Sequence, residues 1–412
     1  MTSIVSGGVT GQRSGAAALR RLVGDDTDEF ASTIWGRELL LTRGADLGRS
    51  FADLLDADAV DELVSRRGLR TPFLRVARDG TTLGDRAFTA GAGVGAGVAD
   101  QVSDDKLVRL FADGATMVLQ GLHRLWPPLT EFSQDLAADL GHPVQVNAYV
   151  TPPQSRGFSD HYDVHDVFVL QIEGEKRWRI HAPVHPAPLR TQPWTSRRAD
   201  VETAAMTEPV LDAVLRPGDC LYLPRGYLHA ATALGGVSTH VTIGVHAWNG
   251  HVVAEQLLAV ALDRLADDED VRESLPLGAD VSDPTGLTVD LELVRARLLR
   301  AVQEASVSDV ARRMAALARS AQRAAPVGPL AQLRACASLD DAVLKVRPHL
   351  APALEPQPDG GCLLRTRAGD LLLGDGDVDA VLLLLNGDVV PAAELGEELA
   401  RRLLLSGVAV AA

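Results

Sequence analysis

Residues 161–181 read HYDVHDVFVLQIEGEKRWRIH, and residues 216–229 read RPGDCLYLPRGYLH. Both segments combine short apolar runs with glycine or proline, a composition typical of strands and turns. His161 and Asp163 are two residues apart, so in an extended chain their side chains face the same side. The second segment delivers His229 after a turn, a strand and a loop bounded by proline and glycine. These segments indicate a β-rich domain that carries a polar site.

This polar set has the composition of a catalytic metal site. Two histidines and one carboxylate can occupy one face of an octahedral Fe(II) ion and leave three positions open. His161, Asp163 and His229 form such a set, but His165 also lies on the same face by the two-residue period. A His161/His165 pair suits other metal-binding barrels, so spacing leaves both Asp163 and His165 as candidate ligands. Spacing also allows these side chains merely to satisfy hydrogen bonds at the mouth of a barrel.

The pattern around these residues predicts an all-β barrel or sandwich with helices on either side. Short apolar runs alternate with Pro/Gly turns between Gln145 and Trp248. Helical spacing of apolar residues precedes this region, over Asp104–Leu122 and Pro128–Leu140. The expected strands are Val144–Val150, Val167–Ile172, Trp178–His181, Cys220–Leu223 and Val241–His246.

The two ends of the chain differ from this centre. Residues 1–20 are rich in Gly, Ser and Ala, and we expect them to be disordered. After Gly250 the pattern is helical, and from about Pro329 the order of elements resembles a small winged-helix unit. The expected elements there are a helix over Asp340–Val346, a hairpin of Cys362–Arg367 and Leu371–Leu373, and a final helix over Ala392–Ser406.

Two longer blocks make the sequence recognisable. Residues 147–178 read NAYVTPPQSRGFSDHYDVHDVFVLQIEGEKRW, and LYLPRGYLH at 221–229 is followed by STHVT at 238–242. Together they strongly resemble the cupin-type Jumonji-C ribosomal oxygenases, enzymes that use Fe(II) and 2-oxoglutarate to hydroxylate residues of ribosomal proteins. By layout, the resemblance extends to the helices after the barrel and to the C-terminal unit.

The resemblance implies a mainly β catalytic core, a double-stranded β-helix or cupin barrel, with flanking helices. A helical dimerisation segment and a C-terminal winged-helix-like unit follow it. The expected domains are a disordered 1–20, a Jumonji-C catalytic domain at 21–250 with its barrel core at 144–248, a helical dimerisation domain at 251–328, and a winged-helix-like domain at 329–412.

The resemblance also assigns roles at the site. His161, Asp163 and His229 would bind iron, which makes His165 a bystander. The cation that holds the distal carboxylate of 2-oxoglutarate falls on Lys176, one of three lysines in a chain with 37 arginines. A buried cation suits that carboxylate; the alternative is an exposed charge that flanks a turn.

Further residues are carried over as neighbours of the iron. Thr242 would help hold 2-oxoglutarate, while Asn147 and Tyr149 would face the substrate. Tyr149 could equally be barrel packing with its hydroxyl satisfied, and His240 could line the pocket or be a satisfied core histidine. Relatives that act on a ribosomal histidine carry a serine where this chain has Gly244, so a hydrogen bond to that substrate is missing here.

The expected function is hydroxylation of a protein side chain, histidine or arginine of a basic ribosomal protein. One alternative is a hydroxylase of a small peptide or amino-acid metabolite. An alternative of another class is a non-catalytic cupin/winged-helix binding module. The net charge of -15 and the pI near 5.2 argue against nucleic acid or an anionic membrane as a partner and suit a basic protein.

Composition also predicts the compartment and the assembly. Cys220, Cys336 and Cys362 lack any CxxC spacing, which fits a reducing compartment, and no apolar leader follows the start of the chain. No apolar run approaches the ~20 residues of a membrane span, so we expect a cytoplasmic protein. Apolar stripes over Leu257–Leu265 and Leu293–Leu317 favour a homodimer, although core packing would explain them equally well.

Overall fold

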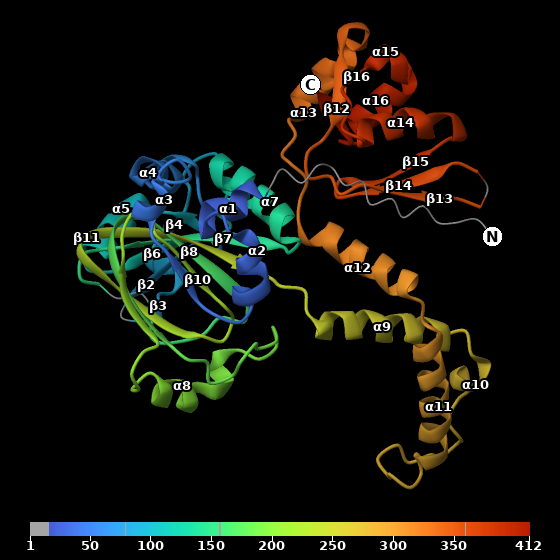
Figure 1. Cartoon of the computed structure of the whole chain (residues 1–412), viewed down its shortest axis with the longest axis horizontal. Helices are drawn as coiled ribbons and strands as arrows, with labels where there is room; N and C mark the ends of the chain where they lie inside the picture. Colours follow the sequence, from blue (N-terminus) through green and yellow to red (C-terminus); the bar gives the residue numbers. More distant parts are fainter. Residues whose placement is uncertain (1–15, 79, 156–157, 359) are drawn as a thin grey trace. The chain divides into compact units, whose positions relative to one another are not determined.

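A computed structural model describes residues 16–78, 80–155, 158–358 and 360–412 (Figure 1). The chain forms two compact units that divide between Ala247 and Trp248. In the described ranges, no helix combines the length and apolar character needed to cross a membrane. Most of the prediction for residues 1–20 falls on residues 1–15, which lie outside the described residues.

The first unit is built on a mixed-length antiparallel sheet with two long strands at its centre. The strands β8 (Asp166–His181) and β11 (Leu228–Val245) pair with each other, and β11 also pairs with β7 (Val144–Thr151). Over the described residues the order is β1-β10-β8-β11-β7-β6-β2-β3, with β9 pairing β8. The remaining strands of this sheet are β1 (Leu40–Thr42), β2 (Leu74–Arg78), β3 (Thr81–Thr82), β6 (Thr116–Leu119), β9 (Leu211–Leu215) and β10 (Cys220–Leu223), and a separate pair is β4 (Thr89–Ala90) with β5 (Gln101–Val102).

The prediction of separate strands at Val167–Ile172 and Trp178–His181 is wrong, because β8 runs through both without a break. Gly174, at φ 64, does not end the strand. It lies beside a register shift between Leu234 and Thr239 of β11, so the glycine is accommodated in the ladder as a bulge. For the same reason β11 begins well before the predicted Val241.

This bulge changes which residues face the interior of the sheet. On β8, Val167 and Val169 line the same cavity as Lys176 and Trp178, so the inward set changes from odd to even numbers across Gly174. On β11 the inward set likewise changes from His229 and Ala231 to His240, Thr242 and Gly244. An extra residue reverses the alternation of a strand. Both halves of each long strand therefore contribute side chains to one cavity.

Helices cover the outer face of the sheet (Figure 1). The main core joins Leu22, Leu63 and Leu129 to Phe168 and Leu170 of β8. Residues 17–20, predicted as disordered, belong to α1, because Leu19 and Leu22 are buried in this core. The helices of the first unit are α1 (Ala17–Val23), α2 (Thr27–Glu29), α3 (Gly44–Leu47), α4 (Ala57–Arg66), α5 (Asp104–Ala112), α6 (Leu122–Leu125), α7 (Pro127–Leu140) and α8 (Arg198–Ala204), with a π-helical turn η1 (Phe30–Ile34) and 3₁₀ turns η2 (Asp85–Ala87) and η3 (Trp194–Arg197).

The predicted helix Asp104–Leu122 is too long. Helix α5 ends at Ala112, and Gly114 at φ 89 turns the chain away. The next residues, Thr116–Leu119, are all buried and form β6 between β2 and β7. An apolar run in the middle of a sheet satisfies a helical pattern and a strand pattern equally well, and here the sheet partners decided.

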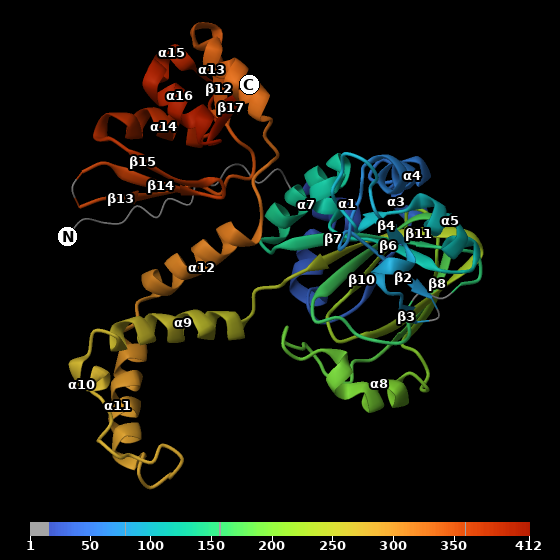
Figure 2. The ribbon, with the colours of Figure 1, turned by 180° about the vertical axis from the view of Figure 1, so that it is seen from behind.

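The second unit begins with helices. Helix α9 (Gly250–Leu265) packs against α11 (Thr288–Glu304) and α12 (Val307–Ala321), as Figure 2 shows from behind. A small apolar cluster that includes Ala261 and Ala301 lies between α9 and α11. A short helix, α10 (Glu269–Arg272), connects them. Large apolar side chains on the opposite faces remain exposed.

The rest of the second unit mixes helices with small sheets. The predicted helix Asp340–Val346 is wrong, because Val343–Val346 is the strand β12, paired on both sides, while the predicted hairpin is confirmed as β14 with β15. These elements enclose their own core around Leu364 and Leu403. The elements are α13 (Pro329–Ala337), η4 (Leu339–Asp341), β12 (Val343–Val346), β13 (Ala353–Pro356), β14 (Cys362–Thr366), β15 (Gly369–Leu373), η5 (Asp375–Asp377), α14 (Val378–Leu385), β16 (Val390–Pro391), α15 (Ala392–Leu395), α16 (Glu397–Leu405) and β17 (Ala409–Ala411).

Candidate active site

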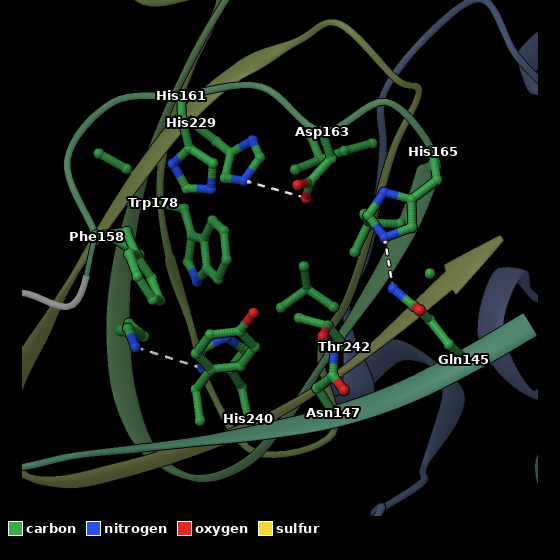
Figure 3. A pocket seen from close by; sticks show the side chains of 18 of the residues that line it. Gln145, Asn147, Phe158, His161, Asp163, His165, Trp178, His229, His240 and Thr242 are labelled. Atoms are coloured by element: carbon green, nitrogen blue, oxygen red, sulfur yellow. Dashed lines mark hydrogen bonds and ion pairs between the residues drawn. The ribbon is translucent and has the colours of Figure 1, made fainter. Parts of the chain in front are cut away.

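A cavity of about 200 Å³ lies among β7, β8 and β11 (Figure 3). It is enclosed by polar and aromatic side chains that point inward from these strands and from the loop before β8. All of the residues predicted for the site line it: Asn147, Tyr149, His161, Asp163, Lys176, His229, His240, Thr242 and Gly244.

The backbone brings His161 and His229 together. Their peptide groups form an antiparallel bridge, with His229 N donating to His161 O at 2.9 Å and His161 N donating to His229 O at 3.3 Å. Directly opposed residues in such a pair present their side chains on the same face. The two imidazole centroids are therefore 4.4 Å apart, although the residues are far apart in the sequence.

Carbonyl oxygens orient both imidazoles. Nδ1 of His161 donates to Ser159 O at 2.7 Å, and Nδ1 of His229 donates to Tyr227 O at 3.1 Å. These contacts engage Nδ1 of each ring and leave Nε2 free to face the other ligands. A metal-binding histidine characteristically has its other nitrogen fixed in this way.

Asp163 completes the group. Its Oδ2 lies 3.8 Å from His229 Nε2, and the candidate ligand atoms of His161, Asp163 and His229 all lie within 4.8 Å of one another. The Gly226 N–H donates to the carbonyl oxygen of Asp163 at 3.0 Å, which ties this residue to the loop before His229. The spacing left both Asp163 and His165 as candidate metal ligands. The structure groups Asp163 with His161 and His229.

The pocket also sets the protonation of these groups. Burial, reinforced by His161, lowers the pKa of His229 to about 4, so its ring is neutral at pH 7. Burial tends to raise the pKa of Asp163, but the neighbouring imidazoles outweigh it and the pKa lies below its ordinary value. A neutral imidazole and an ionised carboxylate are the forms that bind a divalent metal. The three residues thus fit Fe(II) in donor type, and His229 and Asp163 also fit it in protonation.

A buried carboxylate supports the loop that carries His229. Asp166 accepts hydrogen bonds from Tyr222 Oη at 2.8 Å, from Arg225 N at 3.0 Å and from Arg225 Nη1 at 3.2 Å. These contacts join the start of β8 to the end of β10 and to the Pro224–Gly226 turn. The network therefore fixes the segment that carries Asp163 in position relative to the segment that carries His229.

Lys176 lies at the other end of the cavity and is 2 % exposed. Its Nζ donates to Thr151 Oγ1 at 2.9 Å and lies 3.4 Å from Nδ1 of His240. No carboxylate among the described residues pairs with it, and burial lowers its pKa to about 7. The alternative of an exposed charge beside a turn is wrong. A buried lysine without an anion fits a ligand that brings its own carboxylate.

The other predicted residues form cross-strand pairs between β7 and β11. Tyr149 faces His240, Asn147 faces Thr242, and Gln145 faces Gly244. The Tyr149 and His240 rings stack at 4.8 Å, and burial raises the pKa of Tyr149 to about 12, so its hydroxyl stays protonated. Asn147 Oδ1 already accepts from Gly121 N at 3.2 Å. Tyr149 and His240 thus both pack against each other and line the cavity.

His165 is more than a bystander in the cavity. It lies outside the group of three ligands, yet its Nε2 is 3.0 Å from the amide nitrogen of Gln145 and its ring stacks on His246 at 5.2 Å. A Cβ atom on Gly244 would lie 2.4 Å from Cδ2 of His165. The imidazole therefore occupies the space that a side chain at position 244 would need.

Sequence reasoning missed the lining residues Arg75, Gln120 and Phe158, and it missed Thr151, whose hydroxyl accepts a hydrogen bond from Lys176. Thr151 could have been found, because it is two residues beyond Tyr149 on the same face of β7. Arg75 and Gln120 come from β2 and from the end of β6, and no local pattern in the sequence links those segments to the site.

Comparison with known families identifies the domain around this cavity. Residues 127–253 match the family model described as the JmjC domain, and the match spans β7, β8 and β11 with all the candidate ligands. The chain contains a Jumonji-C domain. The prediction of this family from the two quoted blocks is confirmed.

Curated relatives of the Jumonji-C domain carry names of oxygenases. The chain is 36% identical over 137 residues to the bifunctional lysine-specific demethylase and histidyl-hydroxylase NO66 of Drosophila persimilis, covering 32% of this chain and 19% of that protein. It is 34% identical over 218 residues to ribosomal oxygenase 1 of Rattus norvegicus, covering 49% of this chain and 35% of that protein. The chain thus spans about a third or less of the length of these two relatives.

Solved structures share the fold over a longer range. The ribosomal oxygenase YcfD of Escherichia coli aligns with a TM-score of 0.55 at 16% identity, covering 94% of this chain and 98% of that protein. YcfD has also been solved in complex with cobalt and 2-oxoglutarate. At this identity the likeness establishes the fold, a Jumonji-C cupin-type core rich in sheet.

Proposed function

We propose that this protein is an Fe(II)- and 2-oxoglutarate-dependent dioxygenase that hydroxylates a protein side chain. One observation carries the proposal: three metal-binding groups converge at one end of a cavity whose other end holds a buried lysine without a counter-ion. A metal centre alone would not need that lysine, and a purely structural polar cluster would not leave its charge unpaired.

The residues divide the work as follows. His161, Asp163 and His229 would hold the iron on one face, and Lys176 with Thr151 would hold the distal carboxylate of 2-oxoglutarate. When bound, iron and 2-oxoglutarate supply the activation of O₂ and the oxidising power needed for an unactivated C–H bond. The cobalt and 2-oxoglutarate bound by YcfD support this assignment.

The protein's own contribution is positioning and exclusion of water. The carbonyls of Ser159 and Tyr227 fix the two imidazoles, so the ligand face is formed before the metal arrives. Trp178 packs with its ring edge to face against His240 at 5.3 Å and closes the wall beside Lys176. Thr242 lines the same cavity, which supports its proposed role as a neighbour of 2-oxoglutarate.

The decisive experiment measures 2-oxoglutarate turnover with Fe(II). We expect succinate formation by the wild-type protein and its loss in His161→Ala and in Lys176→Ala. His251→Ala, on an exposed part of α9, and Lys345→Ala, on β12, are the matched controls and should retain activity. Turnover that survives His161→Ala would refute the metal assignment, and a wild-type protein that binds neither metal nor 2-oxoglutarate would favour the non-catalytic binding module.

For the substrate we propose a side chain of a basic ribosomal protein, histidine or arginine. The names of the curated relatives, ribosomal oxygenase and histidyl-hydroxylase, support this class, as does the net charge of -15. Mass spectrometry of ribosomal proteins from a deletion strain should reveal the loss of one added oxygen atom. Intact modification in that strain, with turnover of free amino acids or small peptides, would instead favour the metabolite hydroxylase.

We further propose a homodimer formed through the helical segment 251–328, followed by a winged-helix-like unit at 329–412 that does not bind nucleic acid. Exposed apolar side chains on α9 and α11 support the dimer, since a monomer rarely exposes such a stripe. An excess of acidic groups in the last unit opposes DNA binding: Asp375, Asp377, Asp379, Glu394, Glu397 and Glu398. The three free cysteines support a reducing, cytoplasmic location.

A further inference from the structure

A row of directly paired residues crosses the sheet of the first unit and begins with a cation. Arg75 of β2 pairs with Val118 of β6, which pairs in turn with Tyr149 of β7. Tyr149 pairs with His240 of β11. Residues directly opposite one another on neighbouring strands share a face of the sheet, and Arg75, Tyr149 and His240 all line the cavity. The strand pairing therefore directs the Arg75 side chain into the cavity.

The guanidinium of Arg75 lacks an acceptor in the part of the chain that the structure describes. None of the described carboxylates forms an ion pair with it, and its buried Nε has no hydrogen-bond partner among these residues. Its neighbour is instead an aromatic ring, since Cζ lies 6.0 Å from the centroid of Phe158. An arginine can donate five hydrogen bonds, and a buried donor that stays unused is costly. Arg75 therefore suits a ligand that supplies the acceptor.

Phe158 also relates Arg75 to the metal ligands. The Phe158 ring centroid lies 6.0 Å from that of His161 and 6.2 Å from that of Tyr149 (Figure 3). Burial raises the pKa of Tyr149, the charge of Asp163 adds to this rise, and the charge of Arg75 opposes it. The tyrosine therefore lies within electrostatic reach of both Arg75 and a metal ligand. A group bound by Arg75 would lie near the metal centre.

The charges of the loaded site leave Arg75 uncompensated. Asp163 is the one carboxylate among the described residues that line the cavity, and its lining cations are Arg75 and Lys176. Burial lowers the pKa of Lys176 with no contribution from Arg75, which indicates that the two cations lie apart. On the proposed function, Asp163 and the two carboxylates of 2-oxoglutarate balance Fe(II) and Lys176. The guanidinium then favours an anion over a neutral acceptor, and its planar fork matches both oxygens of a carboxylate.

We propose that Arg75 binds a carboxylate of the substrate and so holds the neighbouring carbon near the metal centre. The carboxylate belongs either to an aspartate or glutamate beside the hydroxylated residue, or to the carboxyl end of a short chain. This inference deepens the proposed function and rests on it. The acidic protein still suits a substrate that is basic overall, because the inference concerns a single carboxylate beside the target.

The test uses the full-length protein loaded with Zn(II) and 2-oxoglutarate, so that no turnover occurs. Isothermal titration compares probes that differ only in one charge. N-acetylarginine and N-acetylhistidine are compared with their amides, which tests a chain end. Doubly blocked dipeptides that join arginine or histidine to glutamate are compared with their glutamine counterparts, which tests a side chain.

We expect the acid of at least one source to bind about tenfold or more tightly than its amide, because a hydrogen bond to a charged group is the stronger one. The chain-end pairs and the side-chain pairs show which source Arg75 accepts. Acids and amides of equal affinity, tighter binding of the amides, or no binding by any probe overturns the proposal.

Variants separate recognition from folding. Arg75→Gln should remove the preference for the acid, and Arg75→Lys, which keeps the charge but not the planar fork, should retain part of it. Arg78→Gln, at an exposed position of the same strand, is the matched control and should keep the full preference. The affinity for 2-oxoglutarate reports the Lys176 end and should be unchanged in all three variants.

A preference for the acid that survives in Arg75→Gln refutes the role of Arg75. A loss of 2-oxoglutarate affinity in Arg75→Gln as large as that in Lys176→Ala also refutes it, because Arg75 would then serve the cosubstrate. Failure of the wild-type protein to bind 2-oxoglutarate refutes the proposed function instead.

Discussion

Lys176 shows how one buried charge can be unfavourable in the free protein and necessary for its ligand. The ammonium group is removed from water, and the neutral Oγ1 of Thr151 is its nearest acceptor. Such a group destabilises the fold until an anion arrives. Two measurable consequences follow, one for ligand affinity and one for stability against pH.

Lys176→Met should weaken 2-oxoglutarate binding by about 2–5 kcal/mol, since the ligand's distal carboxylate would then be buried without its cation. Isothermal titration in the presence of Mn(II) measures this change. Lys345→Met makes the same substitution on β12, away from the cavity, and this variant should bind 2-oxoglutarate as the wild type does. Equal affinities of both variants would contradict the assignment of Lys176.

The pH dependence of stability follows from the same residue. Burial lowers the pKa of Lys176 to about 7 from its ordinary 10.5. Between these values the unfolded chain binds more protons than the folded one, so this group makes the unliganded protein more stable as the pH rises from 7 towards 10.5. Below pH 7 the folded protein bears the full free-energy cost of burying the charged lysine. Urea unfolding across this range should therefore show Lys176→Met gaining most over the wild type at or below pH 7.

His165 and Gly244 should behave as a coupled pair. Gly244→Ala is expected to cost about 1–3 kcal/mol of unfolding free energy because the new methyl group collides with the His165 ring. In the background of His165→Ala the same change should cost far less. Gly236→Ala, on the same strand with open space around it, is the control. Additive losses in this double-mutant cycle would show that the two sites do not share the space.

At the scale of an element, the bulge in β8 and β11 decides which side chains meet. Gly174 allows the alternation to reverse, so that Val169 before it and Lys176 after it face the same cavity. A regular strand would turn one of the two halves outward. The bulge therefore brings Val169, His240 and Thr242 into the cavity that Lys176 and His229 line from the other halves of the same strands.

Gly174→Ala should accordingly destabilise the first unit by about 3 kcal/mol or more, since the left-handed backbone is unfavourable for alanine and its Cβ would lie 2.1 Å from Val237 O. Gly235→Ala separates these causes, because Gly235 has φ 68 but nothing within 4 Å of its Cβ. It should lose about 1–2 kcal/mol. Chemical unfolding of both variants measures the difference. Equal losses would mean that the approach of Val237 is unimportant.

At the scale of the whole molecule, the helical segment offers a surface for a second copy of the chain. Leu262 on α9 is 58% exposed and Leu299 on α11 is 59% exposed, beyond the small cluster that joins these helices. Such side chains gain by being covered in a symmetric interface.

Leu262→Asp combined with Leu299→Asp should convert the proposed dimer to a monomer, because a charge in an apolar interface is not compensated. Light scattering after size-exclusion chromatography gives the mass directly. Leu405→Asp introduces the same charge at an equally exposed position of α16 and should leave the mass unchanged. A wild-type protein that is monomeric at high concentration would end the dimer proposal.

Some strands were predicted from the sequence with correct bounds, and others were predicted as helices. Strands with uninterrupted apolar runs, such as Cys220–Leu223, were predicted with correct bounds. Val343–Val346 and Thr116–Leu119 were predicted as helix but are strands, because their sheet partners lie far away in the sequence. The periodicity of a short segment holds no information about sheet partners that are distant in the sequence.

The sequence by itself determined the Jumonji-C family and the identities of the residues proposed for the site, because short motifs such as His161 to Asp163 and the unusual Lys176 are local features. The tertiary structure alone decided that His229 pairs with His161 through the backbone, that Lys176 is buried without an anion, and that the His165 ring takes the space above Gly244. The physical reason is that burial and close approach depend on residues distant in the chain, which no local pattern encodes.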